Sequence, residues 1–195
     1  MVRLVLAGAH SRILSTLCAA CPHSPSGCCV GPPPLDWSDI GRIVALGGRE
    51  WLLGEVAAQR LVPFERGLLI RRRKGVARPG GPRMAKCVYH RERGCSIDAR
   101  HRPATCNYYV CESALAPTEN EERADAGPIA SSAGSRLSQG LAQQFRRWDA
   151  VLADVVASTW PEGPPFDAPF LDGLGVLFER LAANPGNDGA ELEEA

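Results

Sequence analysis

The chain has 195 residues, of which 45% are hydrophobic and 23% are charged, and its formal net charge is zero. This size and composition indicate one globular domain with a modest core and argue against two large independent domains. No uninterrupted apolar run reaches the length of about eighteen residues that a membrane-spanning helix needs, so we expect a soluble protein with no membrane segment.

The two signs of charge are unevenly distributed along the chain. Residues 1–70 carry six Lys or Arg against five Asp or Glu, residues 71–111 carry eleven against two, and residues 112–195 carry five against fifteen. The basic segment at 71–102 could attract an anionic partner such as a nucleic acid or an acidic protein. It would equally offset the negative charge of a metal ion held by thiolates, and we favour this local explanation.

The first predicted element covers residues 2 to 17. Arg3 precedes an apolar stretch that ends at Ala9, but His10 and Arg12 follow, where a secretory signal would continue apolar to a small-residue cleavage site. We therefore expect a short helix that leads into the first cysteine loop.

Eight cysteines fall into two groups, and this clustering is the strongest chemical signal in the chain. Their density in 195 residues is below that of a small disulfide scaffold, and we find no export signal, so we expect a reducing, cytoplasmic location. Clustered thiols in such a compartment are typical of metal sites. The eight candidate ligands are Cys18, Cys21, Cys28, Cys29, Cys87, Cys95, Cys106 and Cys111.

The first group combines a C-x-x-C pair with two adjacent cysteines. Cys18 and Cys21 have the spacing at which a tight turn presents two thiolates to one ion. The sequence that follows them is a loop rather than the strand and helix of a redox motif. Cys28 and Cys29 are neighbours whose side chains diverge, so they are poorly placed to grip one ion equally. Two ions, or one cluster with several irons, would use this group more fully.

The second group is predicted to be a hairpin followed by a helix. Lys86–His90 has a strand-like pattern and Arg91–Gly94 reads as a turn, which would bring Cys87 and Cys95 near each other. Arg102-Pro103 predicts the start of a helix. The spacing of Cys106 and Cys111 requires that helix to end or bend between them if both bind one ion.

These motifs resemble those of the YkgJ-like cysteine-cluster family, whose domains are assigned to zinc or iron chelation. The resemblance covers roughly residues 18 to 111 and rests on C-x-x-C followed by Cys-Cys, then C-V-Y-H, G-C-S-I and R-P-A-T-C-N-Y-Y. It differs in the first motif, where six residues instead of three separate Cys21 from Cys28. The resemblance implies that the seven cysteines from Cys18 to Cys106 bind metal, with Cys111 as an eighth ligand. The family has no settled reaction, and a few relatives are linked to protein lysine methylation.

Between the two groups, Asp36 to Leu46 predicts a helix with a capped start and an apolar stripe that ends at Gly47-Gly48. Leu68 to Ile70 predicts a strand that runs into a basic turn, Arg71 to Lys74. Together with Lys86–His90 this strand would form a small antiparallel sheet.

After the cysteines, we predict a linker at 117–134, a helical hairpin at 135–184 and a disordered tail at 185–195. The apolar residues of the hairpin recur at three- and four-residue intervals, from Leu137 to Val156 and from Leu171 to Leu181. These helices would cover a metal-binding domain at 1–116. The expected fold is therefore α+β, with a small cysteine-cluster core, a short antiparallel sheet and covering C-terminal helices.

Three functions are compatible with these features. The first is a metal-binding protein in which zinc or iron, as single ions or an iron-sulfur cluster, is at least structural. The second is a metal- or cluster-dependent enzyme that performs redox chemistry or methyl transfer, with catalytic residues that the sequence does not identify. The third is an adaptor that binds nucleic acid or an acidic partner through the basic segment 71–102. His23, His90 and His101 are lesser candidates for metal ligands.

Overall fold

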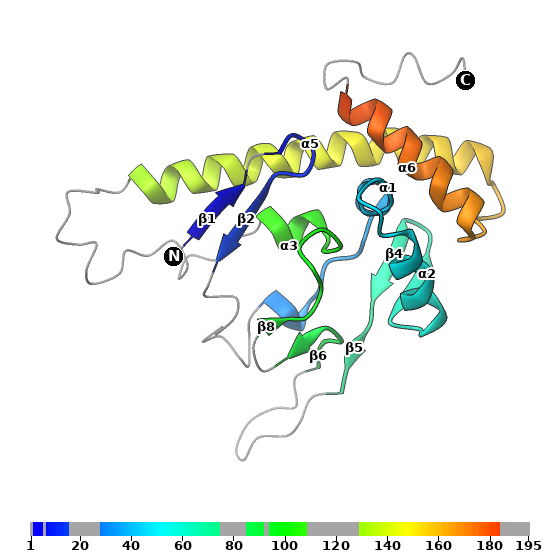
Figure 1. Ribbon diagram of the computed structural model, residues 1–195, viewed down its shortest axis with the longest axis horizontal. Coiled ribbons are helices and arrows are strands. Elements are labelled where there is room, and N and C mark those ends of the chain that lie inside the picture. Colours follow the sequence, from blue (N-terminus) through cyan, green and yellow to red (C-terminus); the bar gives the residue numbers. More distant parts are fainter. Residues whose placement is uncertain are drawn as a thin grey trace.

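The structure, a computed structural model, describes residues 2–5, 7–15, 28–74, 85–91, 94–108 and 129–183. These residues form helices and short antiparallel strand pairs, which confirms the predicted α+β class (Figure 1). The helices are α1 Trp37–Ala45, α2 Arg49–Ala57, α3 Ala104–Tyr108, α5 Ile129–Thr159 and α6 Ala168–Ala183, with a 3-10 turn, η2, at Cys28–Val30. The strand pairs are β1 Val2–Val5 with β2 Arg12–Ser15, β3 Leu61–Phe64 with β4 Gly67–Ile70, β5 Arg72–Arg73 with β6 Lys86–Cys87, and β7 His90–Arg91 with β8 Gly94–Cys95.

The N-terminal segment is a β-hairpin, so the predicted short helix at residues 2–17 is wrong. β1 and β2 pair antiparallel, with Val2 opposite Ser15 and Val5 opposite Arg12. Valines at both ends of β1 favour extended backbone. Gly8 reverses the chain with a φ of +54°, a conformation that glycine adopts without steric cost.

Helix α1 lies at the centre of the fold, beneath α5 and against α6 (Figure 1). The predicted helix at Asp36–Leu46 is confirmed. Asp36 is its N-cap, and the Asp36 carboxylate accepts a hydrogen bond of 2.9 Å from the Asp39 N–H. Ile40 and Ile43 of its apolar stripe are fully buried, both at 0% exposure, and Val44 is partly buried. Most of the helix is therefore core, and its polar side chains are buried with it.

The β3–β4 hairpin is fastened to the chain just before α1. Backbone hydrogen bonds join Leu35 and Leu68 in both directions, at 2.8 and 2.9 Å. A Cβ atom on Gly67 would lie 2.2 Å from the Leu35 carbonyl oxygen, and the Gly67 φ is +125°. Only glycine fits there. The predicted strand at Leu68–Ile70 is confirmed within β4. Its predicted pairing with Lys86–His90 is wrong, because β4 pairs with β3 and β6 pairs with β5. The predicted basic turn is also wrong, because Arg72 and Arg73 form strand β5.

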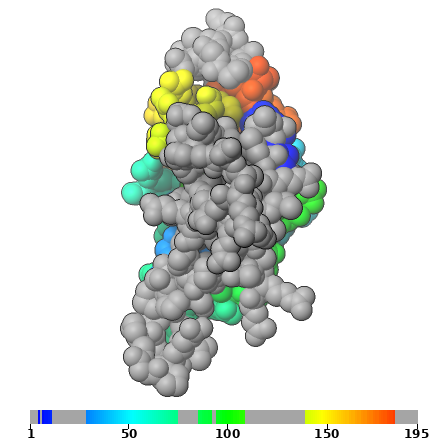
Figure 2. Space-filling model, turned by 90° about the vertical axis from the view of Figure 1, so that its left-hand side faces the viewer, coloured from blue at the N-terminus to red at the C-terminus, as the bar shows by residue number. Residues whose placement is uncertain are grey.

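The two predicted C-terminal helices are present as α5 and α6. Helix α5 begins at Ile129, within the predicted linker, so residues 129–134 are helical. Linker residues 117–128 and the predicted tail 185–195 lie outside the described residues. In a side view, the coloured parts of α5 and α6 and the turn between β1 and β2 lie in the upper part of the molecule (Figure 2). No helix among the described residues is long and apolar enough to cross a membrane.

The close approach of α1 and α6 predicts a stability difference between two helical glycines. A Cβ on Gly41 would lie 2.7 Å from Phe178 Cβ and 2.9 Å from the Leu174 carbonyl oxygen, whereas a Cβ on Gly54 in α2 meets nothing within 4 Å. Gly41→Ala should therefore lower the free energy of unfolding by about 1–3 kcal/mol. Gly54→Ala should raise it by up to about 1 kcal/mol, because alanine favours a helix. Denaturant unfolding of both variants measures this, and equal effects would contradict the packing described.

Candidate metal centre at the cysteine-bearing strands

The structure describes four of the predicted ligand side chains on four separate elements. Cys29 lies in η2, Cys87 in β6, Cys95 in β8 and Cys106 in α3. Cys18, Cys21 and Cys111 lie outside the described residues, and Cys28 is described by its backbone alone. Their positions relative to the other thiols therefore stay predictions.

The end of the first cysteine group packs against the second. η2 contacts β6, on the side of α3 away from α5 (Figure 1). The guanidinium of Arg72 in β5 donates a hydrogen bond of 3.4 Å to the Val30 carbonyl. Because Arg72 is also the strand partner of Cys87, β5 links the two groups. The fold thus brings together segments nearly sixty residues apart, from Cys29 to Cys87.

Cys87 lies at the end of β6, just before a tight turn at Val88 and Tyr89. Its thiol is buried, and the backbone N–H groups of Tyr89 and His90 are close enough to Sγ to lower its pKa. Burial raises the pKa of Cys87, and a charge on Cys95 would raise it further, whereas the two N–H donors and Arg73 lower it. N–H groups aimed at a sulfur stabilise a thiolate once the negative charge is shared with a metal ion.

Cys95 lies near Cys87, as the hairpin prediction requires, but through a different strand arrangement. The chain turns at Val88 and Tyr89, so Cys95 is the strand partner of His90 rather than of Cys87. The pair is extended by a 2.9 Å hydrogen bond from the Ser96 N–H to the Tyr89 carbonyl. The two sulfurs are close enough that a negative charge on Cys95 would raise the pKa of Cys87.

His90 has a nitrogen suited to ligation. Its Nδ1 is buried and has no hydrogen-bond partner among the described residues. Burial, followed by the charges of Lys86 and Arg73, lowers the pKa of His90, which favours the neutral ring that binds metal. His101, the other described histidine near the cysteines, stacks on Trp51 with the ring centroids 4.9 Å apart.

The described side chains do not by themselves complete a metal site. No group of three or more His, Cys, Asp or Glu residues within the described ranges is arranged to hold an ion. Cys106 is exposed on α3. A full ligand set would therefore have to draw on the cysteines outside the described residues.

A buried polar network holds the turn after Cys87 against α2. The Tyr89 hydroxyl donates to Glu55 Oε2 at 2.5 Å, and Glu55 is 8% exposed. Arg60 donates to both carboxylate oxygens of Glu55, which lowers the pKa of Glu55. The turn that carries the sulfur-directed N–H groups is thus fixed by a charged partner in the preceding helix.

The loop between Cys95 and Cys106 is held by a buried ion pair that the sequence reading missed. Asp39 and Arg42 of α1 are each 2% exposed, and Arg42 Nη2 lies 3.2 Å from Asp39 Oδ1. Arg42 also donates to the carbonyls of Arg100, at 2.9 Å, and Arg102. Asp39 accepts 2.6 Å from the Ala104 N–H at the start of α3. The sequence did contain one sign of this ion pair: Asp39 and Arg42 are oppositely charged, three residues apart, and lie within an apolar stripe.

Carboxylates also gather at the start of α1. Asp149 of α5 accepts hydrogen bonds from the N–H groups of Trp37, at 2.8 Å, and Ser38, at 3.4 Å. Burial, and next the charge of Asp36, raises the pKa of Asp149 to about 6. Burial, and next the charge of Asp36, raises the pKa of Asp39, whereas Arg42 and the Ala104 N–H lower it and favour the carboxylate of the ion pair. The helix N-terminus thus binds α5 through a carboxylate that burial makes costly to ionise.

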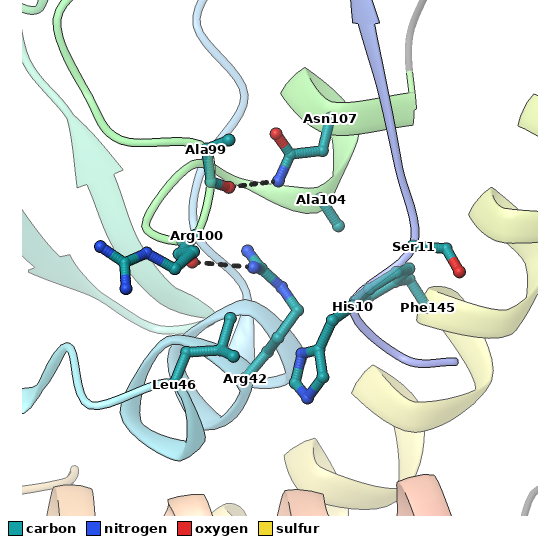
Figure 3. Close-up of a pocket in the computed structure, with 9 residues that line it drawn as sticks. All are labelled: His10, Ser11, Arg42, Leu46, Ala99, Arg100, Ala104, Asn107 and Phe145. Carbon is teal, nitrogen blue, oxygen red and sulfur yellow. Dashed lines mark hydrogen bonds between the residues drawn. The ribbon is translucent and has the colours of Figure 1, made fainter. Parts of the chain in front are cut away.

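A small cavity adjoins this network, and Figure 3 shows Arg42 reaching across it toward the Arg100 carbonyl. Its volume is about 10 Å³, enough for about one water molecule. Arg42 Nε and Asn107 Oδ1 are buried beside it with no hydrogen-bond partner among the described residues. Because small-molecule sites occupy about 300–1,000 Å³, this cavity is not a substrate site.

Comparison of the chain with protein-family models, curated proteins and solved structures gives no match in any of the three. Functional inference therefore depends on the residues of this chain.

The raised pKa of Asp149 predicts a pH dependence of stability. Because its folded pKa, about 6, lies above the ordinary value of 3.8, the folded state binds more protons between these values. The contribution of this group is therefore most favourable below about pH 4 and is lost as the pH rises through about 6, by up to about 3 kcal/mol. Asp149→Asn keeps an oxygen for the Trp37 N–H and should flatten that part of the pH profile.

The control is Asp154→Asn, an exposed position on the same helix. Denaturant unfolding from pH 4 to pH 8 should give the wild-type slope for this control. A wild-type slope in Asp149→Asn as well would show that Asp149 does not titrate as described.

Proposed function

We propose that this chain is a metal-binding protein in which zinc or iron joins the two cysteine groups. The observation that carries the proposal is the turn after Cys87, which brings two backbone N–H groups close to a buried sulfur. An uncharged thiol gains little from two such donors, but a metal-bound thiolate gains a charge-assisted bond from each. The resemblance to the YkgJ-like cysteine-cluster family supports the same function.

The residues present fit a thiophilic metal. Cys87 would supply a thiolate, with either Cys95 or a neutral His90 as a second ligand, because no three described side chains form one ligand group. The remaining ligands of this ion would come from the cysteines outside the described residues, Cys18, Cys21 and Cys111, and from the Cys28 side chain. Cys29 and Cys106 would serve a second ion. Bound metal would supply Lewis acidity or, as an iron-sulfur cluster, electron transfer; the protein residues position the sulfurs and stabilise their charge.

Charge balance accounts for part of the basic segment without an external partner. Arg73 lowers the pKa of Cys87, and its strand partner Lys86 lies beside that cysteine in β6. An ion with several thiolate ligands carries net negative charge that such residues offset. Binding of an anionic partner through 71–102 and a metal-dependent reaction remain alternative functions with less support.

We further propose that the metal is structural. Strands β5 to β8, of which β6 carries Cys87 and β8 carries Cys95, are two residues long each, too short to be stable without further contacts. Metal bound across them would contribute directly to the free energy of folding.

Replacing one central ligand tests the proposal. Protein purified anaerobically should contain zinc or iron at stoichiometric level by elemental analysis, and Cys87→Ser should reduce metal affinity by at least about tenfold. Ser96→Ala is the control, because its hydroxyl donates to the Tyr89 carbonyl beside the site, at 2.9 Å, without being a ligand candidate. Competition with a chelator measures both variants. If the Cys87→Ser variant binds metal at stoichiometric level with wild-type affinity, Cys87 is not a ligand.

A further inference from the structure

A second candidate site lies away from the cysteine-bearing strands, at the C-terminal end of α5. A groove of about 700 Å³ separates the tip of the β3–β4 hairpin from the α5–α6 connection. Its apolar wall consists of partly buried aromatic residues, Phe64 from β3 and Trp160 and Phe166 from the connection. Prolines 63, 161 and 164 extend the same wall. The volume lies within the range of about 300–1,000 Å³ that is typical of ligand sites.

The aromatic wall is held in place by packing beneath it. Phe170, which is 2% exposed, contacts Trp160 edge-on with the ring centroids 5.0 Å apart and Phe166 at 5.5 Å. Phe166 also stacks on the buried Trp37 at 5.9 Å. Because these rings are already held in one position by the residues packed behind them, binding of a ligand to their outer faces would cost little free energy in ordering the side chains.

The rim of the groove is acidic. Glu65 in the β3–β4 turn, Asp154 in α5 and Glu162 in the α5–α6 connection are exposed, and they form no ion pair with any other described residue. The single basic lining residue, Arg66, lies 3.7 Å from the Asp149 carboxylate, which offsets its charge. The groove therefore offers net negative charge around an apolar, aromatic floor.

We propose that this groove binds a basic, proline-containing segment of a partner protein. Proline rings pack on aromatic and proline walls, and a polyproline II segment is already extended, so it binds a shallow groove at low entropic cost. Acidic residues spaced around the rim match basic side chains spaced along such a segment. Most lining residues are exposed, which suits an extended peptide better than a small molecule, because small-molecule sites enclose most of the ligand surface.

Titration with short capped peptides tests the proposal on the full chain. The probe consists of Arg-Pro-Pro repeats, and the control peptides replace either each Arg by Glu or each Pro by Ala. The readout is the indole N–H resonance of Trp160 in the NMR spectrum, assigned with Trp160→Phe. Trp51, which stacks on His101 near the cysteine-bearing strands, serves as an internal reference. We expect saturable shifts of Trp160 with the Arg-Pro-Pro peptide, little change at Trp51, and at least about tenfold weaker binding of both control peptides.

Charge reversal at the rim localises the binding without disturbing the core. Glu65→Lys with Glu162→Lys should weaken binding of the Arg-Pro-Pro peptide by at least about tenfold. Glu179→Lys, an exposed position on α6 outside the groove, should leave the affinity unchanged. The proposal is wrong if the Trp160 resonance does not respond to the peptide. It is also wrong if the Arg-Ala-Ala peptide binds equally well, or if the rim variant retains wild-type affinity.

Discussion

The buried pair of Asp39 and Arg42 is the interaction on which the rest of the structure depends. It lies in α1, at the centre of the core, and its remaining hydrogen bonds reach the carbonyls of Arg100 and Arg102 and the N–H of Ala104. The loop that connects Cys95 to Cys106 is thus pinned to the main hydrophobic core by charged groups. Loss of one partner of such a pair typically costs about 3–5 kcal/mol, because the other charge is left buried without compensation.

This arrangement couples a well-packed half of the molecule to a weakly packed one. Helices α1, α5 and α6 bury most of the large apolar residues, whereas β5 to β8 are two-residue strands. The cysteine-bearing strands are held by polar contacts: Arg72 on Val30, Glu55 on Tyr89, and Arg42 on the following loop. Apolar burial in this half is limited to a few residues such as Cys87, Tyr89 and Ile97, and a metal ion across the thiols would add to their stabilisation.

The local pattern of apolar and capping residues was enough to predict α1 and the two C-terminal helices, because each of these helices is an amphipathic segment with a clear start or period. The fold class follows from these helices and the short strand patterns. It failed for the N-terminal hairpin, where a four-residue strand carries too little pattern to distinguish it from a helix turn. Helix α2 was not predicted, since its apolar residues do not form a single stripe. The roles of Arg42, Asp39 and Asp149 depend on contacts between residues far apart in sequence, up to 112 positions for Asp149 and Trp37, which no local pattern contains.

For the cysteines, too, the sequence predicts the local features but not the contacts between distant segments. Their spacing predicts thiol chemistry, and the strand pattern around Lys86–His90 predicts that Cys87 approaches Cys95. The sulfur-directed N–H groups of Tyr89 and His90 and the packing of η2 on β6 come from the three-dimensional structure. These two features support the proposal that the cysteine groups bind metal together.

The most direct test of that conclusion is X-ray absorption spectroscopy of the anaerobically purified protein. We expect a zinc or iron edge with a first shell dominated by sulfur, at about 2.3 Å if the metal is zinc. A first shell of oxygen and nitrogen alone, or a protein without stoichiometric metal, would contradict it.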